Sequence, residues 1–590
     1  MNGEPESRLS RIGKAAGCLR VWLILIPVIF VILLGLTQFL PGGRRGFSDW
    51  VQPLLFLFTV SLAAATALVA VWVAGRWVCR WHVLKRVFVG GGCLIVLMAL
   101  FYAEEDWRGW RAWNQFKLEW EAKGEKLNLA SLVPPQVPEH QNFALTPIVF
   151  TSYGQILTRE GKLIPAERRD ESFVVRMRMP ITLNVPGPTN WAGDRVRGTL
   201  SRLEGWQRYY RELAGSADDF PVTAQAQSPA ADVLLALSKY DGVLQELRAA
   251  CQMPYSRYPL NYDSESPFMI HLPHLAVLKS CAVMLQLRSL AELQLSQPDK
   301  ALEDVRLGLQ LADKVRTEPL LISQLVRIAM VQLMLQPVWE GLAEHKWSDA
   351  QLAAVEAELA KLDFPAAWAT SMKSELGAQA DELEHLLRQR DGFDELQGLI
   401  NFAGNNTKVR LPDKWVARLV PKGWFYQNEY RCARLMADYC IPLADASQGT
   451  FSPAVARRGA ETLAADGTGP FSLAAGLIMP VLNNAAPKFA YGQASVDLAR
   501  TALALERCRL ARGAFPESLD ALAPQFVVKV PHDVIGGGPL QYSREPDVGF
   551  VLYSIGWNEK DDGGEAAFDK GGAVDIQKGD WVWRRTGKAE

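Results

Sequence analysis

The sequence predicts a mainly α-helical protein with transmembrane helices at its N-terminus, a middle domain of helical hairpins and a small α+β module at its C-terminus. Three observations support this class. Long uncharged runs lie before residue 103, apolar residues recur every three or four positions after Pro229, and strand-like runs flank a turn near residue 545. With 590 residues, the chain has room for an anchor and about two to four further domains.

Three apolar segments, residues 21–40, 51–75 and 87–102, form the predicted membrane anchor, residues 1–103. The first two carry no charge and, at about 1.5 Å per residue, are long enough to cross a hydrocarbon core of about 30 Å. The third is shorter and contains Gly90, Gly91 and Gly92, but its many Leu, Ile, Val and Phe residues favour insertion. We therefore predict three transmembrane helices.

The distribution of basic residues predicts the orientation of these helices. Four basic residues precede the first segment and four lie between the second and third, whereas the third segment is followed by Glu104, Glu105 and Asp106. The positive-inside rule then places the N-terminus in the cytoplasm and the residues after about 103 on the opposite side. If the third segment did not insert, the large C-terminal part would be cytoplasmic instead.

Residues 104–142 are predicted to form an aromatic helix followed by a Pro-rich linker. The aromatic residues recur every three or four positions: Trp107, Trp110, Trp113, Phe116 and Trp120. This spacing fits a juxtamembrane helix whose indole rings lie among lipid headgroups. It fits equally a helix that packs its aromatic side chains on the soluble domain, and the sequence leaves both interpretations open.

The next two segments differ in period. Residues 143–228 form a mixed α/β segment, in which Val175, Met177 and Met179 alternate with arginines as in a half-buried strand. Residues 229–395 have helical periodicity and are predicted to form a domain of helical hairpins. Residues 290–313 resemble one tetratricopeptide-type hairpin, although the next pair of helices does not follow at the spacing of a regular repeat.

Several local signals set the helix boundaries in this domain. One helix is expected from His274 to Leu295, and Pro298 and Pro319 are each expected to open another. Ser348 and Gln351 have the spacing of a capping box. Residues 396–493 are predicted to be a connector of short helical runs separated by polar breaks.

The C-terminal module, residues 494–590, has a more specific order of motifs. A helix from Ala494 ends at Gly513, a short helix follows Ser518, and an antiparallel hairpin leads to an acidic, glycine-rich loop at residues 558–564. This order resembles the globular end of the major pseudopilin of type II secretion systems. The pseudopilin leader and membrane-proximal helix are absent here, so we expect a folded module that does not assemble into a pilus.

This resemblance implies a calcium site in the acidic loop. The implied ligands are Ser554, Asp561 and Asp562, with glycines that allow carbonyl oxygens to turn inward. Asn558 replaces an acidic residue of the pseudopilin, which removes one negative charge. The alternative is an ordinary Asp-Gly turn with solvated carboxylates.

The chain as a whole also resembles uncharacterised bacterial envelope proteins of the planctomycete and verrucomicrobial type. For such a protein, the predicted orientation implies a multi-pass location in the bacterial inner (cytoplasmic) membrane with the large C-terminal part facing the periplasm. The resemblance implies no activity. It is carried by residues 106–109, 141–144, 231–238 and 556–564.

The sequence contains none of the short motifs typical of serine hydrolases, zinc proteases, P-loop proteins or dinucleotide-binding proteins. The net charge of −1 and the lack of a long basic run argue against nucleic-acid binding. His271 and His274 have a spacing that a metal could use, and residues 381–384 are rich in carboxylates, but both fit ordinary helix surfaces. The five cysteines after residue 250 form no C-x-x-C pair and are interpreted as buried free thiols.

Two hypotheses about function follow. The first is a membrane-anchored extracytoplasmic scaffold or interaction protein without catalytic activity, whose partners are the lipid bilayer and other envelope proteins; we identify no small-molecule substrate. The alternative is a membrane-bound, hydrolase-like enzyme whose active site in the helical domain is assembled from residues distant in sequence. A deep pocket that gathers His271, His274 or the carboxylates of residues 381–384 would favour the enzyme.

Overall fold

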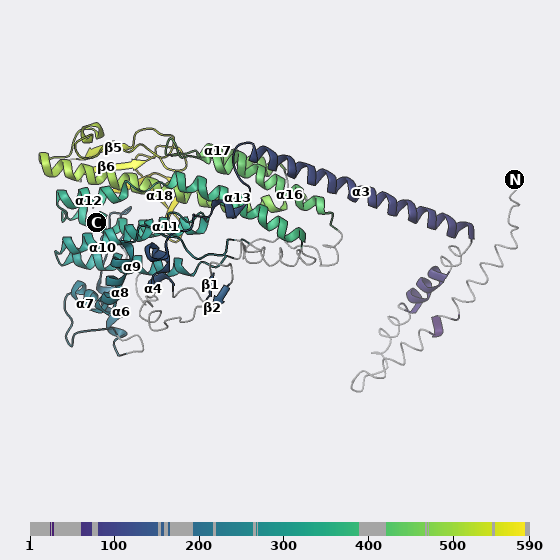
Figure 1. Cartoon of the computed structure of the whole chain (residues 1–590), viewed down its shortest axis with the longest axis horizontal. Helices are drawn as coiled ribbons and strands as arrows, with labels where there is room; N and C mark the ends of the chain where they lie inside the picture. The colour runs from purple at the N-terminus through teal and green to yellow at the C-terminus, as the bar shows by residue number, and fades with distance from the viewer. Residues whose placement is uncertain are drawn as a thin grey trace, which may run out of the picture. The chain divides into compact units, whose positions relative to one another are not determined.

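The computed structural model of the chain describes residues 24, 26–28, 59, 61–72, 81–150, 155–157, 163–165, 193–215, 220–262, 267, 270–388, 420–466, 469, 471–545 and 549–584. They divide into two compact units, Met1–Glu104 and Glu105–Glu590. The protein is mainly helical and carries small antiparallel sheets, in agreement with the predicted class (Figure 1).

The longest helix at the N-terminal side is α3, Trp81–Glu121, which begins in the first unit and ends in the second. The predicted third membrane segment and the predicted aromatic helix are therefore a single helix of 41 residues. The three consecutive glycines, Gly90 to Gly92, do not interrupt it. By its length and composition, this helix is long and apolar enough to cross a membrane. The side chains of its apolar stretch are exposed in the structure.

Of the first two predicted membrane segments, the structure describes only residues 24, 26–28, 59 and 61–72, which include a short apolar helix, Ser61–Trp72. The remainder of both segments lies outside the described residues. In the second unit, α11, Leu321–Ala343, is also long and apolar, but most of it is buried. We therefore interpret α11 as a core helix of the second unit.

The predicted hairpin helices are present in the second unit. Helices α9, Pro273–Gln294, and α10, Pro298–Asp313, pack against each other, and α11 packs on both. The predicted capping box lies at the start of α12, Asp349–Leu359. The backbone N–H of Gln351 donates to Ser348 Oγ at 3.4 Å, and the backbone N–H of Ser348 donates to Gln351 Oε1 at 2.9 Å. Pro319 immediately precedes the N-cap residue of α11 and is not its first helical residue.

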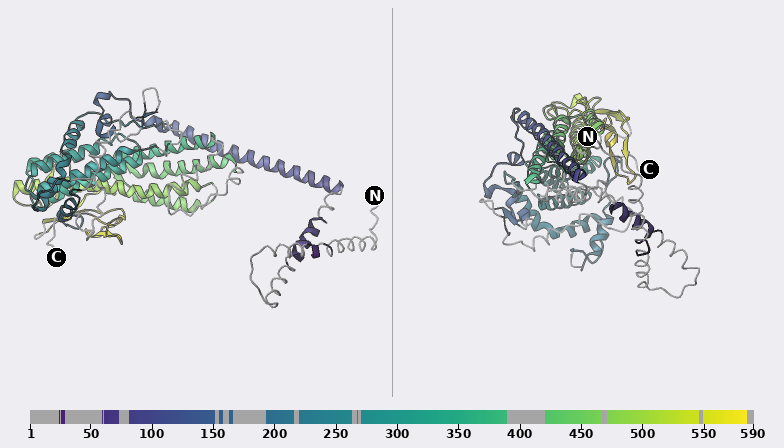
Figure 2. Two further views of the ribbon diagram at one scale, coloured as in Figure 1. Left: turned by 90° about the horizontal axis from the view of Figure 1, so that it is seen from below. Right: turned by 90° about the vertical axis from the view of Figure 1, so that its right-hand side faces the viewer.

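Further helices that the structure describes in the second unit lie around this group, and the longer ones run side by side (Figure 2). They are α4 (Pro147–Phe150), α6 (Glu204–Glu212), α7 (Pro229–Leu237), α8 (Asp241–Cys251), α13 (Phe364–Arg388), α16 (Lys422–Leu435) and α17 (Pro453–Asp466). A π-helical turn, Met436–Cys440, continues α16.

Helix α18, Leu473–Arg512, differs most from the prediction. It is 40 residues long and begins well before the predicted start at Ala494, within the segment expected to hold only short helical runs. Pro480 and Pro487 lie inside it, although proline in a helix interior removes a backbone hydrogen bond. Packing against α11, α12, α13 and α16 stabilises the helix despite the hydrogen bonds that these prolines remove.

The C-terminal strands pack on α18. The predicted hairpin is formed by β5, Gln541–Glu545, and β6, Gly549–Ser554, which pair antiparallel. The prediction did not include β9, Trp581–Arg584, which pairs with the other edge of β6 and buries Trp581 and Trp583. Beside this sheet, β7, Ala566–Phe568, pairs with β8, Val574–Gly579.

Helix α18 ends at Gly513, as predicted, and the φ of 77° at this residue is the left-handed conformation that glycine adopts without strain. The five cysteines after residue 250 are buried and free, which also agrees with the prediction. In the mixed segment, the structure describes a short hairpin of β1, Gln155–Leu157, and β2, Leu163–Pro165. Val175, Met177 and Met179 lie outside the described residues.

Candidate functional site

The C-terminal half of α3 packs into the second unit through aromatic side chains on one of its faces. We call the part of α13 and α16 around this face the socket. Trp113, Phe116 and Trp120 are only 1%, 2% and 5% exposed. Their rings stack in sequence with centroid distances of 5.8 and 5.9 Å, and Phe116 meets Tyr430 of α16 edge to face. Because these residues are spaced three and four apart, they occupy one face of the helix. For these three residues, packing on the soluble domain is the correct interpretation.

The other tryptophans of α3 lie on a different face. Trp107 and Trp110 are 56% and 53% exposed. The Arg111 guanidinium lies over the Trp107 ring, 5.2 Å from its centroid. The aromatic helix therefore combines a buried face, which binds the second unit, with exposed indole rings nearer the apolar stretch of the same helix.

Close backbone contact joins α3 to the start of α16. A Cβ added to Gly109 would overlap the carbonyl oxygen of Gly423, and one added to Gly423 would overlap that of Glu105. Only glycine leaves room for this approach. The Gly423 N–H donates to Asp106 Oδ1 at 2.7 Å, so an α3 carboxylate caps the first turn of α16.

Glu105 adds side-chain hydrogen bonds to the same junction. Its Oε2 accepts from Trp424 Nε1 at 3.1 Å and from Gln427 Nε2 at 3.0 Å, and Glu105 itself is buried. In the sequence analysis, Glu105 and Asp106 served only as the acidic residues that follow the third predicted membrane segment. Their second role could not be read from the sequence, because their partners on α16 lie in a distant part of the chain.

The described part of the socket contains buried polar atoms without hydrogen-bond partners. Glu429 of α16 is buried, and its Oε1 has no partner, as is true of Gln379 Oε1 on α13 and Trp113 Nε1 on α3. Burial, opposed by the charge of Lys117 and reinforced by that of Glu382, raises the pKa of Glu429 to about 8. Glu429 is therefore neutral at pH 7. Its spacing from Cys432, Ala433 and Met436 on the apolar face of the helix is the signal that could have identified it.

The acidic residues 381–384 do not converge on a pocket. Asp381 Oδ2 accepts the backbone N–H of Leu129 at 2.9 Å, and Glu384 forms an ion pair with Lys117 at 3.1 Å. Glu382 is buried. These carboxylates connect α13 to α3 and to the segment after it, which is a structural arrangement.

The two histidines with possible metal spacing are separated by their environments. His271 is exposed, whereas His274 is fully buried at the start of α9. His274 Nε2 lies 2.9 Å from Glu318 Oε2, and Glu318 Oε1 accepts from Ser323 Oγ at 2.6 Å. Tyr258 stacks on the imidazole with ring centroids 4.0 Å apart. This hydrogen-bond chain joins α9 to α11 inside the core and leaves the two histidines without a common ligand position.

The predicted calcium ligands each have a separate partner. Ser554 Oγ is buried and donates to Asp533 Oδ1 at 2.7 Å. Asp561 Oδ1 accepts from Tyr553 OH at 3.0 Å, and Asp562 Oδ2 accepts from Asn558 Nδ2 at 2.8 Å.

Asp580, which the sequence interpretation did not include, also faces this loop. Its carboxylate accepts the N–H groups of Asp562 and Gly564. Burial, together with the charges of Asp562 and Asp561, raises its pKa. Within the part of the chain that the structure describes, no group of three His, Cys, Asp or Glu side chains is placed to hold a metal ion. Calcium binding at the loop stays a prediction, which a calcium titration of the melting temperature would test.

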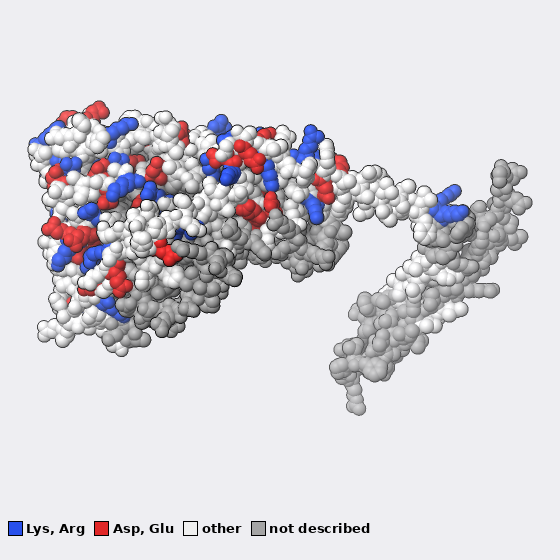
Figure 3. All heavy atoms as spheres, in the orientation of Figure 1, with Lys and Arg blue, Asp and Glu red and all other residues white. Residues whose placement is uncertain are grey.

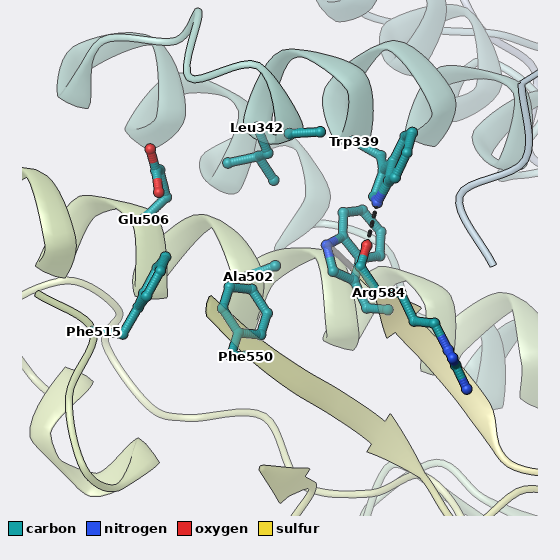
Figure 4. Close-up of a pocket in the computed structure, with 9 residues that line it drawn as sticks. Trp339, Leu342, Ala502, Glu506, Phe515, Phe550 and Arg584 are labelled. Atoms are coloured by element: carbon teal, nitrogen blue, oxygen red, sulfur yellow. Dashed lines mark hydrogen bonds between the residues drawn. The ribbon is translucent and has the colours of Figure 1, made fainter. Parts of the chain in front are cut away.

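A small cavity lies where the C-terminal sheet meets α11 and α18 (Figure 4). Its volume is only about 20 Å³, roughly the space of one water molecule. The Trp339 indole N–H donates to the Arg584 carbonyl at 2.5 Å beside it, and Phe515, Phe550 and Leu342 provide an apolar lining. This is a packing defect at a junction, too small for a substrate, and neither His274 nor residues 381–384 line it.

Comparison of the chain with protein-family models, with curated proteins and with solved structures found no match. The fold and the described contacts therefore define the class of protein: a mainly helical protein in which one long helix carries an exposed apolar stretch and is clamped into a helical unit.

Proposed function

We propose that the protein is a membrane-anchored scaffold of the bacterial envelope that presents its second unit to other envelope proteins. In this proposal the chain crosses the inner membrane several times, and the second unit faces the periplasm. The observation that carries the proposal is α3, whose exposed apolar stretch continues without a break into the helix that the second unit grips.

The mode of attachment supports a scaffold. The apolar stretch continues into the second unit as one helix, with no Gly/Ser-rich or Pro-rich linker between them. Within the second unit, the Phe116–Tyr430 and Gly109–Gly423 contacts join this helix to α16, and Trp113 and Trp120 are buried.

The surface of the second unit is consistent with interactions between proteins. Positive and negative side chains are intermixed over its visible face (Figure 3), and the whole chain carries a net charge of −1. This pattern does not resemble the continuous basic surface that nucleic acids require.

Among the described residues, the groups named for the alternative, an enzyme with a non-local active site, do not meet in one pocket. His271 is exposed and His274 is enclosed by Tyr258 and Glu318. The carboxylates of residues 381–384 have structural partners or are buried.

Cross-linking in native membranes tests the proposed function. The full-length chain would be treated with a lysine-reactive cross-linker and purified, and the linked peptides identified by mass spectrometry. We expect one or a few envelope proteins linked reproducibly to lysines of the second unit. Hydrolysis of an ester, phosphoester, peptide or glycoside reporter that co-purifies with the protein at constant specific activity would contradict a non-enzymatic role.

A further inference from the structure

The second unit carries exposed aromatic and basic side chains on its part of α3 and at the start of α16. Trp107 and Trp110 are more than half exposed, and Arg111 is exposed on the same helix. Lys422 is also exposed and directly precedes Gly423, whose backbone contacts Gly109. Half-buried Phe471, just before α18, lies 5.5 Å from the Trp424 ring and 5.8 Å from the Arg108 guanidinium. We call Trp107, Trp110, Arg111, Lys422 and Phe471 the interfacial collar.

The charges of the collar are biased by the contacts described above. Three carboxylates precede Trp107 on α3: Glu104 is exposed, whereas Glu105 and Asp106 are directed into the start of α16, where they accept hydrogen bonds from Trp424 and Gly423. The carboxylates of Glu105 and Asp106 therefore have hydrogen-bond partners within the second unit. Arg111 and Lys422 remain at the surface, a combination that suits an anionic headgroup layer.

The length of the apolar stretch determines where the collar lies along α3. The uncharged run extends from residue 87 to residue 103 and appears as the white part of the helix in Figure 3. At about 1.5 Å per residue it spans about 25 Å, which is about 5 Å less than a typical hydrocarbon core. A short span draws its flanking residues toward the bilayer.

Trp107 lies about one helical turn beyond the end of the apolar run, and Trp110 lies about one turn further. At about 1.5 Å per residue both indole rings therefore fall about 6–10 Å beyond the run, in the headgroup layer where tryptophan is enriched. Both rings are exposed, whereas the next aromatic residues of α3, Trp113 and Phe116, are buried.

We propose that the interfacial collar binds the headgroup region of an anionic bilayer, so that the second unit rests directly on the membrane surface. The inference rests on the proposed anchoring function and adds a second lipid contact to it. The apolar stretch holds the chain in the hydrocarbon core, whereas the collar fixes the depth and orientation of the second unit through indole and basic side chains.

Photo-cross-linking from single positions tests this proposal in the full-length chain. A benzoylphenylalanine residue would replace Leu97, Trp107, Trp110 or Leu118 in turn, and the protein would be reconstituted into nanodiscs of equimolar phosphatidylglycerol and phosphatidylcholine. Leu118 is the matched control, because it is 68% exposed on the same helix but about two turns beyond Trp110. We expect acyl-chain adducts at 97, headgroup-region adducts at 107 and 110, and no lipid adduct at 118.

The outcomes separate the collar from the anchor. Lipid adducts at 97 without any at 107 and 110, or protein adducts at 107 and 110, would overturn the collar and leave the anchor intact. No lipid adduct at 97 would contradict the proposed anchoring itself. In pure phosphatidylcholine the yield at 107 and 110 should fall, and Arg111→Gln with Lys422→Gln should remove this lipid preference. Equal yields of the unsubstituted collar in both membranes would exclude recognition of anionic headgroups.

Discussion

At the scale of single residues, two glycines determine how closely α3 and α16 approach. Gly109 and Gly423 come from distant parts of the sequence, and a Cβ on either would overlap a backbone carbonyl. A backbone atom cannot move aside as a flexible side chain can. The contact between α3 and α16 therefore depends on the absence of two side chains.

Gly423→Ala should destabilise the second unit by about 1–3 kcal/mol, because the added methyl group overlaps the Glu105 carbonyl. Gly242→Ala is the matched control, since Gly242 also lies in a helix but has open space around its Cβ position. The control should gain up to about 1 kcal/mol. Thermal unfolding of the full chain in detergent measures both changes, and equal effects of the two substitutions would contradict the close contact.

Buried carboxylates make the stability of the second unit dependent on pH. Burial raises the pKa of Glu429 to about 8, and burial also raises that of Asp497 on α18 to about 7. In the unfolded chain both groups ionise near their ordinary values, around 4. The contribution of these two carboxyl groups to the free energy of unfolding is complete below their pKa in the unfolded chain. It is lost as the pH rises toward their pKa in the folded chain.

We therefore expect the melting temperature to fall between about pH 5 and pH 8. Glu429→Gln should reduce the change in the free energy of unfolding over this range by an amount on the order of a few kcal/mol. The substitution keeps the shape of the side chain and removes its titration. Glu461→Gln, at an exposed position of α17, is the control and should leave the pH profile unchanged. Parallel profiles of native protein and Glu429→Gln would show that Glu429 does not titrate in this range.

At the scale of elements, α3 has two aromatic faces with different expected energetics. Trp113→Ala should cost about 3–5 kcal/mol, because it removes a fully buried ring from a stack with Phe116. Trp107→Ala should change stability in detergent by no more than about 0.5 kcal/mol, because the ring is exposed. Chemical unfolding of both variants in one detergent provides the comparison, and a larger loss for Trp107→Ala would reverse the assignment of the two faces.

The sequence predicted those elements whose signals are local. Proline at the start of α10 and the Ser348–Gln351 pair before α12 identified helix starts that the structure confirms. The N-terminal half of helix α18 was missed, because the segment before Ala494 was expected to hold only short helical runs and the tertiary contacts that stabilise the long helix are distant in sequence. Strand β9 was missed for a related reason: its partner β6 ends at Ser554, and the hairpin of β7 and β8 lies between them in the sequence.

The candidate site was less predictable than the fold. Periodicity grouped the aromatic residues of α3 but could not distinguish a lipid-facing face from a buried one, since both are apolar. The contacts with Tyr430 and Gly423, which lie on α16, show which face of α3 is buried. The loop at residues 554–562 shows the opposite case, in which residues close in sequence, Ser554 and Asp561, have different hydrogen-bond partners in the folded chain.

At the scale of the whole molecule, the second compact unit begins at Glu105, inside α3. A soluble chain that starts at Glu105 should keep the aromatic face and unfold cooperatively. One that starts at Leu127, after the end of α3, lacks three core aromatic rings and should aggregate or unfold at a much lower temperature. Circular dichroism and size-exclusion chromatography of the two chains make the comparison, and equal stability would show that α3 contributes no core to the unit.

The most direct test of the central claim, that α3 spans the membrane and carries the second unit across it, is the location of the C-terminus. The full chain would be fused at its end to alkaline phosphatase, which is active only outside the cytoplasm, or to a fluorescent protein that folds only inside. Leu94→Arg with Leu97→Arg places two charges in the apolar stretch, each of which costs about 2.5–3.5 kcal/mol at the centre of a span. Leu118→Arg is the control outside that stretch.

We expect phosphatase activity without fluorescence for the unsubstituted chain and for Leu118→Arg, and the reverse for the double arginine variant, because failure of α3 to insert returns the second unit to the cytoplasm. Fluorescence of the unsubstituted fusion, or phosphatase activity that the two arginines leave unchanged, would contradict a membrane-spanning role for α3.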